Sequence, residues 1–293
     1  ANKRTGHAYL FTGPRGTGKT TLARIFAKTI NCTERVEVKK NPIVRTEPCN
    51  KCESCKLIME NRALDFIEID AASHTGVDNI RQLRETVPLP PSALKYKVYI
   101  IDEVHMLSIG AFNALLKTLE EPKKKTVLFL ITNDESKLLS TIQSRCQMIH
   151  FSPVSEKEIQ ESLEGKGGDV EEIVAHAHGL PGKAILWSNN KESFGEYKNE
   201  VIRFQSLLGK NFYEKLKSVE DLFGDKTDHI LARSKLQEAL NIWQVELHNS
   251  IKQKKVDAEH FCKISDHIKQ ARTLLAKNVH PRLLIEHILL QLP

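Results

Sequence analysis

A glycine-rich stretch near the start of the chain constrains the fold more than any other feature. Residues 13–20 read Gly-Pro-Arg-Gly-Thr-Gly-Lys-Thr, which matches the pattern G-x-x-x-x-G-K-[ST] without a mismatch. The stretch follows an apolar segment, 9–12, and opens a helical pattern over 19–29, which is the context that a phosphate-binding loop requires. A chance glycine turn is the alternative, and this context makes it the weaker one.

The chemistry of such a loop is specific to nucleotides. Its backbone N–H groups surround phosphate oxygens, and the helix N-terminus adds a partial positive charge. Lys19 is expected to reach the β and γ phosphates of ATP, and the Thr20 hydroxyl to bind Mg²⁺. The residues predicted to bind the nucleotide are Gly13, Pro14, Arg15, Gly16, Thr17, Gly18, Lys19, Thr20 and Thr21.

Two carboxylates end a second apolar segment. Residues 97–102 predict a buried strand that ends at Asp102, and Glu103 follows it. Ligands in parallel α/β folds bind at the carboxyl ends of strands. We therefore predict that Asp102 holds Mg²⁺ together with Thr20, and that Glu103 polarises the attacking water as a general base. A pair of surface acids at a strand end is the alternative interpretation.

Three further polar residues are candidates for the same site. Thr132 and Asn133 end another apolar segment, 126–132, where they are candidates to orient water or the γ-phosphate. Arg145 is a candidate to reach a phosphate in a neighbouring subunit. From residue chemistry alone these roles stay open, because polar residues often terminate strands.

Four of the six cysteines lie close together, at positions 32, 49, 52 and 55. Tetrahedral Zn²⁺ binds four thiolates, and closely spaced cysteines form the turns that such sites use. A redox Cys-x-x-Cys pair would leave Cys32 unexplained, and unligated thiols are a third interpretation. The spacing favours a structural zinc site formed by Cys32, Cys49, Cys52 and Cys55.

The first half of the chain alternates strand and helix patterns. Predicted strands cover 9–12, 66–70, 97–102, 126–132 and 148–151, and predicted helices cover 19–29, 77–86 and 110–120. This alternation indicates a parallel α/β sheet covered on both faces. The later part is helical, with predicted helices over 155–164, 170–178, 183–188, 216–223, 228–251, 258–277 and 281–292.

Composition and charge exclude some protein classes. The chain has 293 residues and no run of 18 apolar residues, and its first residues lack the architecture of a signal peptide. These features predict a cytoplasmic protein with no membrane partner. A net charge of +6 permits contact with a nucleic-acid backbone without requiring it, and Lys123, Lys124 and Lys125 are candidates for that contact.

Several stretches together resemble a known family. Residues 7–32, 48–55, 65–85, 97–122 and 141–151 resemble the bacterial clamp-loader ATPases, which are the gamma/tau subunit of DNA polymerase III and its relative delta-prime. The front half of the chain is more similar to gamma/tau. The segments 179–183 and 278–292 are more similar to delta-prime.

The resemblance implies a three-part architecture. The first part is an α/β AAA+ P-loop NTPase core over residues 1–151, with a zinc module inserted at about 32–55. A small helical lid over 152–189 and an all-α collar domain for oligomerisation over 190–293 follow.

The resemblance also implies roles for single residues. Arg145 would act as an arginine finger in trans, and Thr132 would serve as sensor 1. The lid of family members ends in a segment whose arginine is sensor 2, and Lys183 stands in the corresponding stretch here. Lys183 is therefore the candidate substitute, although lysine lacks the planar fork of arginine. Family members carry a further segment before the phosphate loop that helps to hold the adenine, so a chain starting at Ala1 is expected to be a processed or partial product.

The implied function is that of a clamp-loader ATPase. ATP binding and hydrolysis would drive the opening of the sliding clamp and its loading on primer–template DNA. The chain would act with other loader subunits in a hetero-pentameric ring at the nucleoid-associated replisome. The alternative is a delta-prime-like stator with little or no ATP turnover of its own. Either subunit belongs to an assembly named DNA-directed DNA polymerase, although this sequence shows no polymerase active site.

Overall fold

The structure is a computed structural model. It describes residues 6–34, 36–37, 46–72, 86–87, 89–120, 125–165, 169–223, 229–252, 258–276 and 279–292. The chain divides into two compact units, 1–188 and 189–293, and each is described by itself. The predicted helix over 77–86 lies outside the described residues apart from its last position, and Lys123 and Lys124 lie outside them as well.

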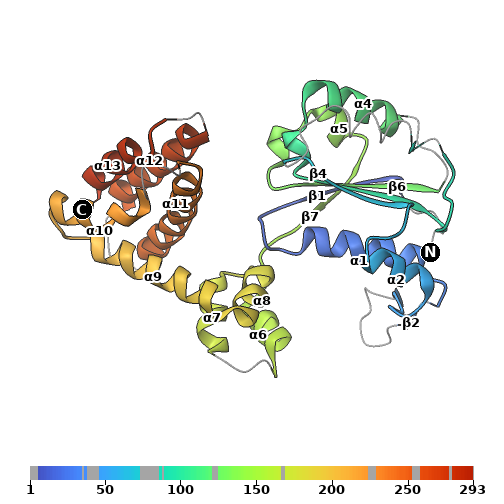
Figure 1. Ribbon diagram of the computed structural model, residues 1–293, viewed down its shortest axis with the longest axis horizontal. Helices are drawn as coiled ribbons and strands as arrows, with labels where there is room; N and C mark the ends of the chain where they lie inside the picture. Colours follow the sequence, from blue (N-terminus) through green and yellow to red (C-terminus); the bar gives the residue numbers. More distant parts are fainter. Residues whose placement is uncertain are drawn as a thin grey trace. The chain divides into compact units, whose positions relative to one another are not determined.

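A parallel sheet forms the centre of the first unit (Figure 1). Its strands are β1 (Ala8–Thr12), β4 (Phe66–Asp70), β5 (Lys97–Asp102), β6 (Thr126–Thr132) and β7 (Gln147–His150), in the order β4-β5-β6-β1-β7. Every neighbouring pair of these strands is parallel. The predicted strands and their parallel arrangement are therefore confirmed, with ends that shift by no more than one residue.

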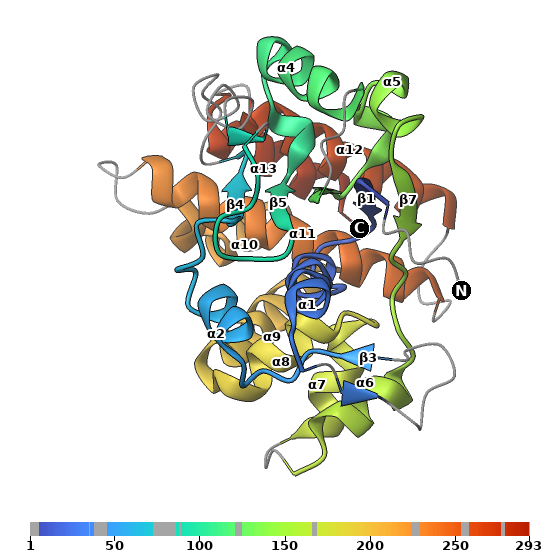
Figure 2. The ribbon, with the colours of Figure 1, turned by 90° about the vertical axis from the view of Figure 1, so that its right-hand side faces the viewer.

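Helices cover both faces of this sheet (Figure 2). The helices on one face are α1 (Lys19–Asn31) and α2 (Glu53–Met59), and those on the other are α4 (Ile109–Glu120) and α5 (Ser140–Gln143). Successive residues of a strand point to opposite faces, so β1 serves two cores. Leu10 packs in the core with α4, and Phe11 packs in the core with α1.

The register of the sheet brings several polar residues to one edge. Thr12 pairs with Thr132 across β1 and β6, and Asp70 pairs with Asp102 across β4 and β5. Because the strands are parallel, the segments that follow them meet at the same edge, which is where sites in such sheets form. The glycine-rich stretch after Thr12 therefore meets Asp102 and Thr132 there.

Short elements complete the first unit. They are the antiparallel strands β2 (Val36–Glu37) and β3 (Thr46–Glu47), the 3-10 helices η1 (Val104–Met106) and η2 (Glu135–Lys137), and the helices α6 (Glu156–Leu163), α7 (Val170–Ala177) and α8 (Pro181–Asn189). Helix α6 begins at the start of the helix predicted over 155–164, where the Ser155 hydroxyl accepts a hydrogen bond from Glu158 N and the Glu158 carboxylate accepts one from Ser155 N at 3.1 Å.

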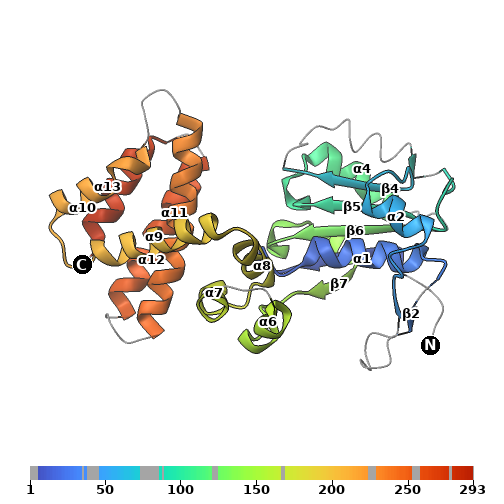
Figure 3. The ribbon, with the colours of Figure 1, turned by 60° about the horizontal axis from the view of Figure 1, so that its bottom comes forward.

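The described residues of the second unit are helical (Figure 3). Its elements are α9 (Lys191–Leu207), α10 (Phe212–Ser218), η3 (Glu220–Phe223), α11 (His229–Lys252), α12 (Ala258–Ala276) and α13 (Pro281–Gln291). Phe204, Trp243 and Phe261 are fully buried in its core. None of the helices in the described part of the chain combines the length and the hydropathy that a membrane span needs.

One predicted helix in this unit is wrong, and another helix has no predicted counterpart. The region predicted as a helix over 216–223 contains the end of α10 and the separate helix η3. Helix α10 starts earlier because the Asn211 side chain accepts a hydrogen bond from Glu214 N at 3.0 Å. Helix α9 begins in the same way, where Asn190 accepts from Ser193 N at 3.1 Å. Asparagine occurs in turns and loops as often as at helix starts, so neither residue by itself marks the beginning of a helix in the sequence.

Candidate functional site

The glycine-rich loop turns sharply between β1 and α1. Gly13, Gly16 and Gly18 have φ values of 141°, 84° and 87°, which favour glycine. At Gly13 a Cβ atom would lie 2.2 Å from the Phe151 carbonyl oxygen, so a larger residue does not fit. Gly18 precedes α1 and has no side chain to cap it, so the first N–H groups of the helix stay available to a ligand.

Lys19 is buried at the first position of α1, with 7% of its surface exposed. Its Nζ donates hydrogen bonds to the carbonyl oxygens of Gly13 and Pro14, both at 2.7 Å. Burial lowers the pKa of the ammonium group, while the Asp102 and Glu103 carboxylates act to raise it. The ammonium is thus held inside the loop by neutral carbonyl oxygens, which bind a cation less strongly than phosphate oxygens do.

Thr20 and Asp102 are in contact, although they lie far apart in the sequence. Thr20 Oγ1 donates a hydrogen bond to Asp102 Oδ2 at 2.8 Å. The other oxygen of Asp102 accepts from the backbone N–H of Glu103, also at 2.8 Å. Hydroxyl and carboxylate oxygens are ligands that Mg²⁺ prefers, so this pair fits the predicted Mg²⁺ site.

Glu103 has a constrained backbone, and the two oxygen atoms of its carboxylate lie in different surroundings. Its φ is 48°, a left-handed conformation that is uncommon for a residue other than glycine. Its Oε1 accepts from Arg15 Nε at 2.8 Å and from the neighbouring Nη2. Its Oε2 is buried and has no hydrogen-bond donor among the described residues, and His105 Nδ1 lies 3.5 Å away.

Thr132 connects β6 to this acidic edge. It is fully buried, and its Oγ1 donates to the Asp134 carbonyl at 3.0 Å. The same oxygen lies 3.1 Å from His105 Nδ1. Burial lowers the pKa of His105, against an opposite effect of Glu103, so the imidazole is neutral at pH 7. The neighbouring Asn133 has a buried Oδ1 without a donor among the described residues.

A cavity of about 380 Å³ opens at this edge of the sheet. It is lined by Arg15, Gly16, Gly18, Lys19, Thr20, Thr21, Asp102, Glu103, Thr132, Asn133 and Gly182. The fold therefore brings together the glycine-rich loop, both carboxylates and both polar residues at the end of β6. Gly13, Pro14 and Thr17 lie in the loop without lining the cavity.

Gly182 is absent from the predicted binding residues. Its N–H donates to the Gly16 carbonyl at 2.8 Å, so the start of α8 is seated on the phosphate loop. A Cβ atom at Gly182 would lie 2.9 Å from that same oxygen. The glycine pair around Leu180-Pro181 signals a helix break in the sequence, but only the fold reveals what the second glycine touches.

Two predicted residues outside the glycine-rich loop also lie outside the cavity lining. Arg145 donates to the Glu120 carboxylate at 2.9 Å and to the Thr141 carbonyl at 2.8 Å, and 34% of its side chain is exposed. Lys183 Nζ lies 5.8 Å from the centre of the Trp187 ring. The roles predicted for Arg145 and Lys183 therefore stay predictions.

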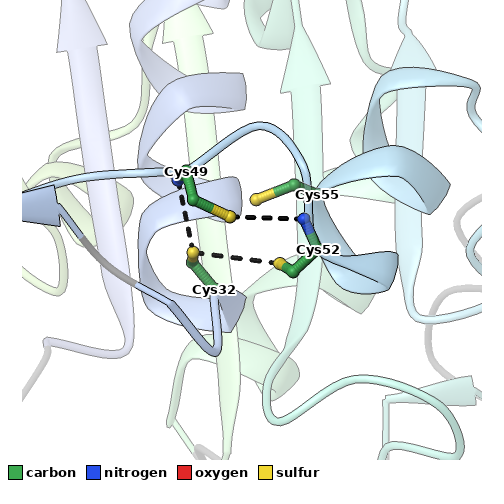
Figure 4. Close-up of side chains that lie close together, drawn as sticks. All are labelled: Cys32, Cys49, Cys52 and Cys55. Atoms are coloured by element: carbon green, nitrogen blue, oxygen red, sulfur yellow. Dashed lines mark hydrogen bonds between the residues drawn. The ribbon is translucent and has the colours of Figure 1, made fainter.

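The four clustered cysteines converge beyond the other end of α1 (Figure 4). Their sulfur atoms all lie within 4.8 Å of one another, and Cys52 Sγ is 3.9 Å from Cys32 Sγ. Zn–S bonds of about 2.3 Å in a tetrahedron place neighbouring sulfurs roughly 3.8 Å apart, so the arrangement fits a zinc ion. All six cysteines of the chain are free thiols, which excludes a disulfide framework in this structure.

Backbone N–H groups surround these sulfur atoms. Cys49 N donates to Cys32 Sγ at 3.4 Å, and Cys52 N donates to Cys49 Sγ at 3.3 Å. Burial acts to raise the pKa of Cys52, but hydrogen bonds from Thr33 and Cys55 outweigh it and lower the pKa to about 6. Burial raises the pKa of Cys55 to about 12, with a contribution from its bond to Cys52.

Comparisons with known proteins give close sequence relatives. A "DNA polymerase III subunit tau" from Bacillus subtilis is 50% identical over 215 residues, which are 70% of this chain and 36% of that protein. A protein of the same name from Escherichia coli is 46% identical over 161 residues, which are 55% of this chain and 24% of that protein. The chain thus spans about a third or less of the length of these relatives.

A solved structure and a family model extend this result. The crystal structure of a DNA polymerase III gamma subunit-related protein from Thermotoga maritima matches 98% of this chain and 94% of its own, with a TM-score of 0.53 and 18% identity. At that identity the match supports the overall fold alone. The model of the family described as "DNA polymerase III, delta subunit" matches residues 1–155, which is more than half of the chain. The chain belongs to this family, and its sequence relatives carry tau and gamma names, as the resemblance predicted.

Proposed function

We propose that this chain is an ATP-binding and ATP-hydrolysing subunit of a DNA polymerase III clamp loader. The observation that carries the proposal is one cavity lined by a phosphate loop with a buried lysine, a Thr20–Asp102 pair and the Glu103 carboxylate. These groups supply phosphate binding, metal binding and a proton acceptor, which are the parts that phosphoryl transfer to water requires.

Each part of the cavity then has a task. The N–H groups at the start of α1 and the Lys19 ammonium bind the phosphates of ATP. Thr20 and Asp102 hold Mg²⁺, which neutralises phosphate charge when bound. Glu103 Oε2 and Asn133 Oδ1 are both buried acceptors without donors among the described residues, which suits the orientation of an attacking water. Thr132 then serves as sensor 1 beside them.

The remaining predicted roles belong to an assembly. Arg145 would reach the nucleotide of a neighbouring subunit once released from Glu120, and Lys183 would approach the phosphates from the lid. On this proposal residues 1–151 form the core, 152–189 the lid and 190–293 the collar. The partners are other loader subunits, a sliding clamp and primer–template DNA, all in the cytoplasm at the nucleoid.

The cysteine cluster has a structural task in this proposal. Cys32, Cys49, Cys52 and Cys55 bind one Zn²⁺ with no open coordination position. The metal fixes the segment that carries β2, β3 and α2 to the end of α1. None of these four ligands lines the cavity of the proposed nucleotide site, so the zinc takes no part in hydrolysis on this proposal.

A second candidate function is a stator that binds nucleotide without turning it over. Two observations favour it: Lys183 lies against the Trp187 ring, and Glu103 is paired with Arg15. On this view the chain contributes binding surfaces to the loader, as the delta-prime-like segments 179–183 and 278–292 suggest.

The test of the main proposal is the Lys19→Ala variant. We expect ATP affinity to fall about 100-fold or more, because the proposed ion pair between the Lys19 ammonium and the ATP phosphates is lost. Clamp loading by the reconstituted loader should then cease. Lys117→Ala removes an exposed lysine from α4 and serves as the control. Undiminished loading by Lys19→Ala, with the Lys117→Ala loader also intact, would remove the cavity from the mechanism.

ATP turnover separates the two candidate functions. The rate is measured for the chain alone and for the assembled loader, with clamp and primed DNA present. A subunit-specific loss of turnover in a loader carrying Glu103→Gln supports the ATPase. Equal turnover by the Glu103→Gln and wild-type loaders, together with tight ATP binding by this chain, supports the stator.

A further inference from the structure

A contact inside the cavity links the glycine-rich loop to the residue after β5. Arg15 Nε donates to Glu103 Oε1 at 2.8 Å, and the Nη2 of the same guanidinium contacts the same oxygen. The two residues lie 88 positions apart, so the fold creates this pair. The Arg15 side chain is 76% exposed, whereas the Glu103 side chain is 14% exposed. The arginine is therefore the partner that solvent or a ligand can reach, and the carboxylate is the more buried one.

The backbone and surroundings of Glu103 hold its carboxylate in place. Its N–H is bound to Asp102 Oδ1, and its φ of 48° sets the direction in which the side chain leaves the strand. Its Oε2 receives no hydrogen bond from the described residues, although it is buried. Among the described residues, the hydrogen bonds that the side-chain oxygens of Glu103 accept therefore come from Arg15. If Arg15 moved away, both oxygens would be able to accept hydrogen bonds from another donor.

The pair has a direct consequence for proton transfer. A general base must offer a lone pair to the proton that it removes, within hydrogen-bond reach of the water. At Glu103 the Oε1 lone pairs already accept from two N–H groups of Arg15, whose charge also offsets that of the carboxylate. In this arrangement a water would have to compete with the guanidinium at Oε1, and at Oε2 it would meet a carboxylate whose negative charge Arg15 offsets.

A bound triphosphate would compete for the same arginine. Arg15 lines the cavity in which the phosphates are proposed to bind, and a guanidinium binds phosphate and carboxylate oxygens in the same planar manner. Lys19 is in a comparable state, because its ammonium is held by the carbonyl oxygens of Gly13 and Pro14. Both cations of the loop are thus paired with protein acceptors that phosphate oxygens can replace.

We propose that Arg15 is a positioning residue that holds Glu103 in an unproductive ion pair while the loop lacks nucleotide, and that triphosphate binding draws Arg15 away and frees the carboxylate for the attacking water. We call this Arg15–Glu103 ion pair the latch, and its proposed action rests on the function proposed for Glu103. It adds a control of when that residue acts, set by the phosphate loop of the same subunit.

The first test separates kcat from KM in the assembled loader. Arg15→Gln keeps the length of the side chain and removes its charge, so we expect kcat for ATP without clamp and DNA to rise about three-fold or more while KM also rises. Arg15→Lys restores the charge with a single donor group and should give an intermediate kcat. A raised KM with kcat at or below that of the wild type overturns the proposal and leaves Arg15 as a phosphate ligand only.

A matched pair in the same unit provides the control. Arg24 donates to both oxygens of Glu68 at 2.9 and 3.0 Å, links α1 to β4, and lies outside the cavity lining. Arg24→Gln therefore removes an arginine–carboxylate pair of the same type. It should leave kcat unchanged, and a rise equal to that of Arg15→Gln would assign the effect to a general loss of rigidity and overturn the latch.

A second test does not depend on hydrolysis. Arg15→Gln, Glu103→Gln and the double variant form a thermodynamic cycle, read as unfolding temperature of the full chain. Without nucleotide we expect a coupling of about 2 °C, and with a non-hydrolysable ATP analogue and Mg²⁺ we expect none. Equal coupling in both states, or none without nucleotide, overturns the latch. If the wild-type loader proves inactive as an ATPase, the proposed function fails, while this cycle still decides whether the latch exists.

Discussion

The two ends of helix α1 carry sites of opposite character. At its start, the backbone turns through glycines with positive φ into an open cavity that holds a buried ammonium and two carboxylates. At its end, Cys32 joins three other thiols in a closed cluster whose sulfurs accept backbone N–H groups. Helix α1 has 13 residues, so one short element positions both sites.

The difference lies in how each site satisfies its charges. The groups at the start of α1 have exchangeable partners: Lys19 is held by backbone carbonyls, and Glu103 is held by an exposed arginine. The sulfurs of Cys32 and Cys49 at the far end accept backbone N–H groups from within the cluster itself, so their partners are part of the main chain. A site that must bind and release a ligand needs the first arrangement, whereas a permanent ion needs the second.

The largest effect is expected at the cysteine end. Cys52→Ala removes one of the four candidate ligands, so zinc content should fall from about one ion per chain to below roughly 0.1, since a structural zinc site needs all four ligands. Elemental analysis of the purified protein measures this directly. Cys262→Ala, at an exposed cysteine of α12, is the matched control and should retain the metal. A folded wild-type protein without metal would disprove the zinc proposal.

A second prediction concerns the loop beside the cysteine end. The buried carboxylate of Asp65 accepts backbone N–H groups from Ser92, Ala93 and Leu94 at 2.8, 2.6 and 2.9 Å. Ala93 lines a cavity together with Cys32, so this loop borders the cluster. Asp65→Asn should lower the free energy of unfolding of the first unit by about 2 kcal/mol at pH 7, because charge-assisted hydrogen bonds become neutral ones.

The pH dependence of this effect has a defined sign. Burial acts to raise the pKa of Asp65, but the three N–H groups outweigh it and hold the pKa below its ordinary value of 3.8. The folded state therefore favours the charged form, and the stabilisation is present above about pH 4 and is lost as the pH falls further toward the folded-state pKa. Denaturant titrations of both proteins at pH 7 and at pH 3 measure it. A stability difference that grows on acidification would contradict this account.

Sequence reasoning predicted the site at the start of α1 in most of its parts. Lys19, Thr20, Asp102, Glu103 and Thr132 line one cavity because parallel strands bring their carboxyl ends to one edge, and that rule needs only the strand pattern. The cluster of cysteines was equally accessible, since four thiols at short spacing have few uses.

Contacts between distant backbone segments were not predictable in this way. The Arg15–Glu103 pair and the hydrogen bond from Gly182 N–H to the Gly16 carbonyl depend on how two segments distant in sequence pack together. No periodic pattern in the sequence predicts such packing. Helix α2 has only seven residues, too few to show a helical period. The start of α10 at Phe212 depends on one asparagine cap. These features are tertiary or single-residue effects, whereas the strands and long helices are patterns.

A third prediction perturbs only the phosphate-loop end. Gly182→Ala places a Cβ atom 2.9 Å from the Gly16 carbonyl oxygen, so α8 must move away from the loop. The shift should weaken nucleotide binding about ten-fold, which corresponds to roughly 1.4 kcal/mol. Zinc content should stay at the wild-type value. Titration with a fluorescent ATP analogue measures the affinity, and Gly195→Ala, where the structure places nothing within 4 Å of the added carbon, is the control.

The smallest effect is expected at a side-chain contact between the end of α1 and the segment that carries the cysteines. Lys28 Nζ donates to Asn50 Oδ1 at 2.8 Å and so ties the last turn of the helix to the cysteine loop. The contact is exposed, and exposed polar pairs contribute little. Lys28→Ala should therefore change the free energy of unfolding by about 0.5 kcal/mol or less, with zinc content and ATP affinity unchanged. A loss of ATP affinity in this variant would show that the cysteine loop and the phosphate loop communicate through α1, and the two ends would then have to be treated as one coupled site.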